Sequence, residues 1–174
     1  GSISGATATF SKDITVNSTT VGLGGSSETT NVAIGYVALA SNTSDHVTQG
    51  TQNTAIGSSA LTSNTTGSGN VGVGSQALVT NTTGYSNVGV GSAALALNTT
   101  GISNVGVGSQ ALDANTTGNS NVGVGKSALG SNTTGGNNVG VGESALSQNT
   151  TGNYNVSVGE GALNSNTTGS FNVG

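Results

Sequence analysis

The stretch "NVGVGKSALGSNTTG" (residues 121–135) admits two opposed interpretations, and the choice between them decides the fold. Its glycines and its Gly-Lys-Ser segment are typical of a loop that binds phosphate. A P-loop, however, needs another glycine five residues before Gly125 and a helix after the motif, and that earlier position holds Ser120. The same letters return every 17 residues, so Lys126 is interpreted as one position of a repeat and not as a nucleotide ligand.

The repeat has the consensus N-V-G-V-G-x-x-A-L-x-x-N-T-T-G-x-x, whose positions we number 1 to 17. Each step is 17 residues from Asn53 onward, whereas the first step is 22, and its extra residues are assigned to a loop at 45–50. Residues that share a position in successive units are called a column below. The first column contains Asn31, Asn53, Asn70, Asn87, Asn104, Asn121, Asn138, Asn155 and Asn172.

A unit of this length is too short for a helical hairpin and fits one coil of a β-solenoid. We therefore predict an all-β protein. A lead-in segment at 1–30 is followed at 31–174 by a parallel β-solenoid or β-roll of about eight 17-residue coils. The glycine pattern of a dinucleotide-binding fold also matches these units, but that fold requires a helix after the strand, for which the period leaves no room.

Side chains of a strand alternate between its two faces, which assigns a side to each residue of "NVGVG". Positions 2 and 4, such as Val71 and Val73, are expected to point inward and to meet position-9 leucines, such as Leu78, from the opposite wall. Position 3 is always Gly, Ala or Ser and is expected to face outward. A column restricted to such small residues is best explained by a second backbone packed closely against it.

Two glycine columns are interpreted as corners of the coil. Glycine fills position 5 of every complete unit and position 15 of every regular unit, and both are expected to need a positive φ. The NTTG segment is expected to be a turn whose asparagines, among them Asn64, Asn81 and Asn98, form ladders from coil to coil. The same N-x-Thr sequences are acceptors for N-glycosylation in a secreted protein, and that alternative stays open.

Composition argues against several classes of function. With two lysines, no arginine and a net charge of −4, the chain is not expected to bind nucleic acid, and no apolar run is long enough to insert into a membrane. His46 is the only histidine and cysteine is absent, so we predict no metal site, no cofactor and no catalytic residues. Lys126 and Glu143, one coil apart in column 6, are expected to form a surface ion pair.

Columns 16 and 17 flank the NTTG turn and collect several large apolar or aromatic side chains among Ser, Gly and Asn. These are Tyr85, Ile102, Tyr154 and Phe171, which we predict to be the surface recognition residues. Exposed aromatic rings suit contact with a sugar or a protein, and they are equally suited to packing against a neighbouring chain.

The segments "NVAIG" (31–35) and "NTAIG" (53–57) and the later "NVGVG…AL…NTTG" units resemble repeats of phage tail-fibre proteins. They are similar, more distantly, to the head repeats of trimeric autotransporter adhesins of the YadA type. The adhesin resemblance implies a left-handed parallel β-roll, three chains side by side, small residues that face the partner subunits, and an adhesive surface. The chain stops within a unit at "FNVG", as expected of a truncated or cleaved fibre.

The resulting expectation is a structural and adhesive segment of a homotrimeric tail fibre, located in the virion and involved in attachment to the host. Its receptor is expected to be a glycan or protein of a bacterial cell surface. Two alternatives stay open. One is a bacterial trimeric surface adhesin head, at the cell surface or extracellular. The other is an ice- or crystal-binding β-solenoid, although Thr65 and Thr66 are adjacent and would face opposite ways in a strand.

Overall fold

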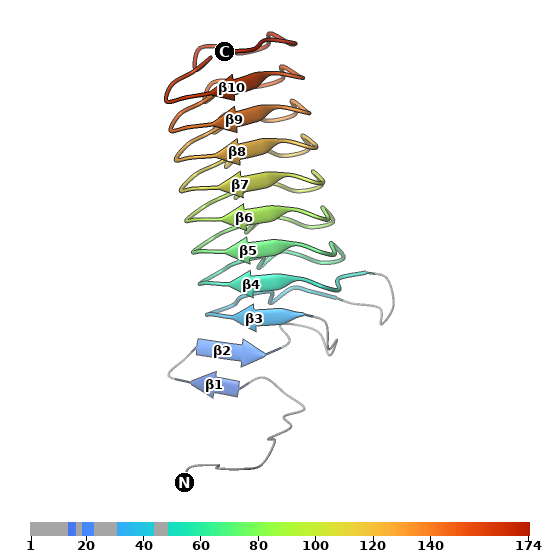
Figure 1. Cartoon of the computed structure of the whole chain (residues 1–174). Coiled ribbons are helices and arrows are strands. Elements are labelled where there is room, and N and C mark those ends of the chain that lie inside the picture. Colours follow the sequence, from blue (N-terminus) through green and yellow to red (C-terminus); the bar gives the residue numbers. More distant parts are fainter. Residues whose placement is uncertain (1–13, 17–18, 23–30, 44–48) are drawn as a thin grey trace.

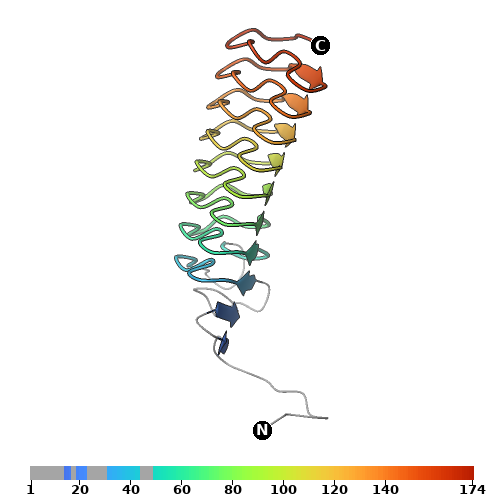
Figure 2. The ribbon, with the colours of Figure 1, turned by 90° about the vertical axis from the view of Figure 1, so that its left-hand side faces the viewer.

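The computed structural model describes residues 14–16, 19–22, 31–43 and 49–174. Over these ranges the strands form a ten-stranded sheet in chain order, stacked along the long axis of the molecule (Figure 1). Figure 2 shows the strands along one side of this stack and the turns along the other. The strands are β1 (Ile14–Val16), β2 (Thr19–Gly22), β3 (Val32–Ile34), β4 (Thr54–Ile56), β5 (Val71–Val73), β6 (Val88–Val90), β7 (Val105–Val107), β8 (Val122–Val124), β9 (Val139–Val141) and β10 (Val156–Val158).

Strands β3 to β10 pair in parallel, each with the equivalent strand of the next coil. Val71 lies opposite Val88 and Gly72 opposite Gly89, so the register advances by one 17-residue unit per coil. The 22-residue first unit keeps the same register, since Ala33 lies opposite Ala55. The prediction of an all-β parallel solenoid with 17-residue coils is confirmed. Of the loop at 45–50, residues 45–48 lie outside the described ranges.

The lead-in segment contributes two strands that the sequence did not predict. β1 pairs with β2 in antiparallel fashion, and β2 pairs with β3 in the same way, with Val21 opposite Ile34. Both strands therefore belong to the same sheet as the repeats. The hydrogen-bonding edge of β3 is covered by β2, which removes one open edge from the parallel stack.

The inward and outward faces of the strands are the reverse of the prediction. Ala55 and Ser157, at position 3, are completely buried, while the flanking positions 2 and 4 are partly or fully exposed. A Cβ on Gly72 would lie 3.3 Å from Cγ of Leu61 and 3.3 Å from the carbonyl oxygen of Ala77. The small column therefore faces the interior of its own chain, and the valines face outward.

The leucines explain this reversal. The position-9 side chains are buried as predicted, from Leu39 to Leu146, and they form the apolar core with the alanines of the first coils. Each leucine lies against the position-3 residue of the neighbouring coil, as Leu95 does against Gly106. The coil is so narrow that one leucine fills the space between its walls, and a second large side chain from the strand would not fit.

The predicted asparagine ladder at position 12 is confirmed. The side-chain amide of Asn81 donates to Oδ1 of Asn64 over 2.8 Å and to the carbonyl of Gly84 over 3.0 Å, and Asn98 donates in turn to Asn81 over 2.7 Å. These side chains are fully buried. The nitrogen of each amide donates to its own turn and to the preceding coil, and its oxygen accepts from the next coil.

A second asparagine ladder, at position 1, was not predicted. The backbone N–H and the side-chain amide of Asn87 both donate to Oδ1 of Asn70, over 3.0 and 3.2 Å, and the amide also donates to the carbonyl of Gly101 over 2.8 Å. Among the described residues, no buried side-chain nitrogen or oxygen lacks a hydrogen-bond partner. The interior is therefore as much a polar network as an apolar core.

The glycine corners are confirmed at position 5 and wrong at position 15. Gly74 has a φ of 134°, a conformation that only glycine adopts readily. Gly84 does not have a positive φ; it is required because a Cβ would meet Oδ1 of Asn81 and the carbonyl oxygen of Gly101 at 2.5 Å or less. The positive φ near that corner belongs to position 17, for example 57° at Ser86.

Positions 7 and 9 also adopt the left-handed region with residues other than glycine, such as Gln76 and Leu78. The N–H of Gln76 donates to Ser58 in the preceding coil, and that of Leu78 donates to Ala94 in the following coil, both over 2.9 Å. Hydrogen bonds to the coils on both sides thus hold an unfavourable backbone that an isolated unit would not keep.

Candidate functional site

The four predicted recognition residues do not form one site. Tyr154 and Phe171, both in column 17, stack on each other with ring centroids 5.0 Å apart and planes 6° apart. Tyr85 and Ile102 belong to column 16 and lie several coils earlier. Tyr85 is 49% exposed, Tyr154 53% and Phe171 77%, whereas Ile102 is only partly exposed.

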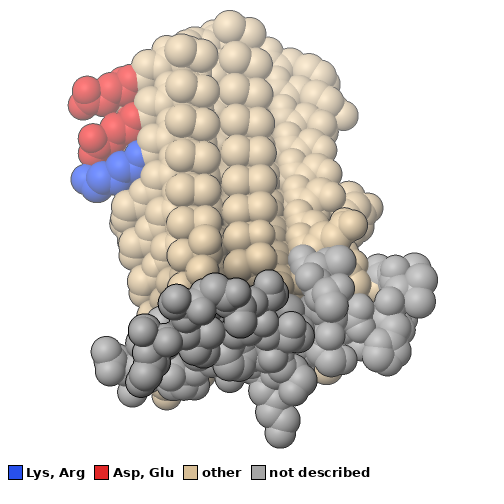
Figure 3. Space-filling view, turned by 60° about the horizontal axis from the view of Figure 1, so that its bottom comes forward, with Lys and Arg blue, Asp and Glu red and all other residues tan. Residues whose placement is uncertain are grey.

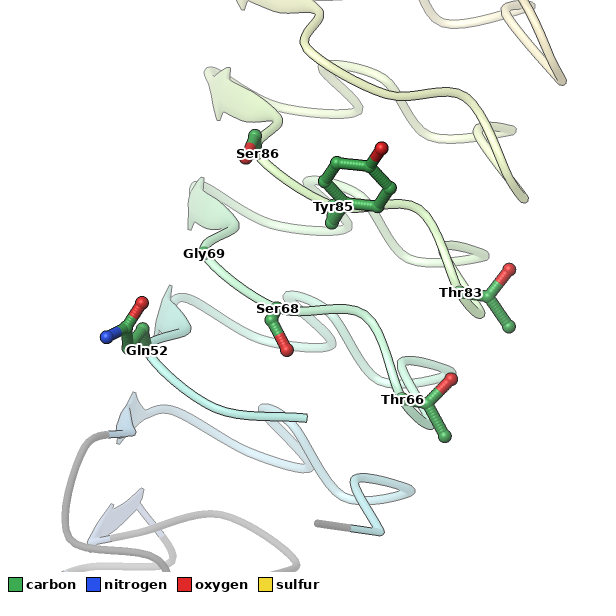
Figure 4. A pocket seen from close by; sticks show the side chains of 7 residues that line it. All are labelled: Gln52, Thr66, Ser68, Gly69, Thr83, Tyr85 and Ser86. Carbon is green, nitrogen blue, oxygen red and sulfur yellow. The ribbon is translucent and has the colours of Figure 1, made fainter. Parts of the chain in front are cut away.

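Tyr85 lines a shallow hollow of about 310 Å³ on the surface of the solenoid. Figure 4 shows its ring with Thr66 and Thr83 on one side and Gln52 and Ser86 on the other. Ser68 and Gly69 form the part of the hollow that belongs to the preceding coil. The wall thus offers one aromatic ring together with hydroxyl and amide groups, and it contains no charged residue.

The backbone around this hollow is held by the same coil-to-coil hydrogen bonds as the rest of the solenoid. The N–H of Ser86 donates to the carbonyl of Ser68 over 3.0 Å, and the N–H of Gly69 donates to Thr51 over 2.9 Å. The carbonyl of Tyr85 accepts from the N–H of Ser103 over 3.1 Å. The residues that line the hollow are therefore fixed in place on regular structure.

A second hollow, of about 490 Å³, was missed by the sequence analysis. Its lining contains Asp113, Gly130 and Ser147 of column 10, together with Ala114 and the serines and glutamines of columns 7 and 11. Partial burial raises the pKa of the Asp113 carboxyl, and hydrogen bonds from the backbone N–H groups of Ala114 and Asp113 oppose that rise. One feature of the sequence could have predicted this hollow: a carboxylate is followed one coil later by a glycine, in a column whose other residues are uncharged.

The ion pair predicted in column 6 is present. Nζ of Lys126 lies 3.0 Å from Oε1 of Glu143, and both side chains are more than half exposed. In Figure 3 the charged side chains stand in one stack at an edge of the solenoid, while the rest of the visible described surface is uncharged. His46 lies outside the described residues. Within those that are described, no three His, Cys, Asp or Glu side chains are grouped as a metal site would need.

The two threonines of each NTTG turn have different surroundings. The hydroxyl of Thr82, at position 13, donates to the carbonyl of Thr99 over 3.1 Å, and most of that column does the same. Thr83, at position 14, is exposed. One column of hydroxyls therefore binds the chain itself, so the turn does not present a doubled threonine array to solvent.

The outward face of the parallel sheet is the largest uniform surface feature. Each of the eight strands β3 to β10 has two outward positions, and all are Val or Ile except Thr54. Val107 and Val124 are each 36% exposed, and Val158 is 64% exposed. We call these two columns the valine face. A sheet with one face in water normally alternates apolar and polar residues, and this one does not.

No helix among the described residues has the length and apolar character needed to cross a bilayer. No family model, no curated protein and no solved structure matches this chain.

Proposed function

We propose that this chain is a structural and adhesive segment of a homotrimeric fibre, of the kind found in phage tail fibres, that contacts a bacterial surface. The observation that carries the proposal is the valine face. A rigid solenoid with a continuous uncharged strip of valines along its length is suited to lie side by side with copies of itself.

We assign the partner surface to different columns from the one that the resemblance implies. The resemblance to adhesin heads implied that small residues face the partner subunits, but position 3 is buried within the chain. The outward positions 2 and 4 take that role in the proposal. At a strand spacing of about 4.8 Å, the seven steps between eight strands give a strip about 34 Å long. Two copies of such a strip bury valines that water would otherwise contact.

The assembly of three chains and the left-handed winding come from the resemblance to fibre and adhesin repeats. The localisation in a virion follows from the same resemblance, with a bacterial surface adhesin as its closest alternative. A shaft of this type places its variable columns outward on every chain, so that each potential binding residue is present three times. Weak individual contacts then add up through avidity.

The first experiment measures the solution mass of the chain by light scattering. We expect about three times the 16.5 kDa of one chain. The double variant Val107→Lys with Val124→Lys puts two charges on the valine face. It should lower the mass towards that of a single chain, because the interface would have to bury unpaired charges.

The matched control also introduces two lysines one coil apart, but on a different column of the surface. Ser92→Lys with Ser109→Lys lies in the exposed column 6, where Lys126 already occurs, and should leave the mass unchanged. A wild-type chain that is a stable monomer would refute the proposed assembly. So would a valine-face variant that keeps the full mass. Adhesion is then tested by binding of the labelled wild-type assembly to a panel of bacterial cells.

A further inference from the structure

We infer that the hollow beside Tyr85 is a binding subsite for a neutral pyranose sugar, with the tyrosine ring as the stacking surface. The inference rests on the proposed adhesive function and names the chemistry of its ligand. Its basis is the combination of one partly exposed ring with hydroxyl and amide groups around it (Figure 4).

The chemistry of the wall matches both sides of a sugar ring. A pyranose has a face of C–H groups, which packs on an aromatic ring, and an edge of hydroxyl groups, which exchange hydrogen bonds. Thr66 and Thr83 place two hydroxyls one coil apart on one side of Tyr85, and the Gln52 amide and Ser86 hydroxyl lie on the other. A wall without charged groups favours a neutral sugar over an acidic one.

Gly69 lines the hollow without a side chain of its own. Its φ of 67° is not the reason for the glycine, since Gln52, Ser86 and Asn137 occupy the same column with φ values of 57° to 59°. A Cβ at Gly69 would have no neighbour closer than 3.8 Å. The backbone thus accepts a side chain here. Such a side chain would begin beside Ser86, which also lines the hollow, and would narrow it on that side.

Tyr154 is the same residue type in a different setting. Its ring is stacked on Phe171, so one of its two faces is already occupied. It is also partly exposed and lies at the same corner of the coil, which makes it the matched control for Tyr85.

The experiment is saturation-transfer NMR on the full chain with a panel of methyl pyranosides as probes: glucoside, galactoside, mannoside and N-acetylglucosaminide. We expect at least one of them to bind with a Kd on the order of 1 mM, as befits a shallow, open site. The transfer should be strongest at the C–H protons of one sugar face. Tyr85→Ser should reduce the signal at least five-fold.

Two further variants separate a binding role from a structural one. Gly69→Asn adds a side chain to the wall of the hollow while Tyr85 stays in place, so it should weaken binding by narrowing the space for the sugar. The fold should tolerate this change, because asparagine already adopts this backbone at position 137. Tyr154→Ser should bind as the wild type does. The inference is overturned if no probe binds the wild type, or if the Tyr85→Ser and Gly69→Asn variants, with unchanged circular dichroism, bind as strongly as the wild type. It is also overturned if Tyr154→Ser loses as much binding as Tyr85→Ser.

The proposed function can survive that failure. If these variants keep the solution mass and the binding to bacterial cells of the wild type, the fibre assignment stands and the hollow is not its sugar site. If the solution mass instead shows a monomer while the probe still binds, the assembly fails and the sugar subsite stands.

Discussion

Positions 3 and 4 of each strand are neighbours in the chain and lie on opposite sides of the sheet. A Cβ on Gly106, at position 3, would come within 3.0 Å of the Ala111 carbonyl oxygen and 3.3 Å of Cγ of Leu95. Val107, at position 4, is 36% exposed and has no such restriction. The interior columns hold Asn, Leu or a small residue in coil after coil, whereas exterior columns such as 6, 10 and 16 vary. The valine face is the exception, because it lies outside and still repeats.

The difference explains why the interior columns repeat more strictly than exterior columns such as 6, 10 and 16. An interior residue has its own counterpart above and below as neighbours, as in the ladder Asn81–Asn98–Asn115. One substitution therefore disturbs two contacts made with consensus residues. An exterior residue at column 6, 10 or 16 faces solvent on one side. Departures from the repeat, and with them any binding chemistry, are concentrated outside.

The largest effect is expected from filling the interior. Gly106→Leu should lower the free energy of unfolding by more than about 3 kcal/mol, because the new side chain competes with Leu95 for the same space. Gly106→Ala should cost less than about 1 kcal/mol, since Ala33 and Ala55 already occupy this column. Urea unfolding followed by circular dichroism measures both. A Gly106→Leu variant as stable as the wild type would place position 3 outside after all.

A smaller but clear loss is expected from the asparagine ladder. Asn98→Ala removes the bonds to Asn81 and to the carbonyl of Gly101, and it leaves the amide of Asn115 without one of its two acceptors. We expect a loss of about 2–3 kcal/mol, because these groups are buried. The exterior control Ser92→Ala should stay within about 0.5 kcal/mol of the wild type. Equal stability of the two variants in urea unfolding would remove the distinction between inside and outside.

The smallest effect is expected at the exterior ion pair. Lys126→Ala should change the free energy of unfolding by no more than about 1 kcal/mol, because both partners are largely in water. The difference from the wild type should disappear in 1 M salt, where charges a few ångströms apart are screened. Unfolding at low and high salt tests this. A loss above about 2 kcal/mol that persists in salt would mean that column 6 is buried in the assembly.

The sequence by itself determined the architecture. The fixed period predicted a parallel β-solenoid, the glycines of position 5 predicted a corner, the asparagines of position 12 predicted a ladder, and Lys126 was correctly assigned to a repeat. These features depend on the spacing of the repeat and on local backbone chemistry, and both can be read by comparing successive units of the sequence. The candidate residue Tyr85 was also found from the sequence, as a large side chain in a column of small ones.

Only the tertiary structure decided which face of the strand lies inside. Alternation predicts that Val71 and Val73 share a side, but it does not say which side. That choice depends on the width of the coil, which one leucine and two asparagine ladders already fill. The hollows were also hidden from the sequence, because each is formed by residues of two or more coils that come together only when the coils stack.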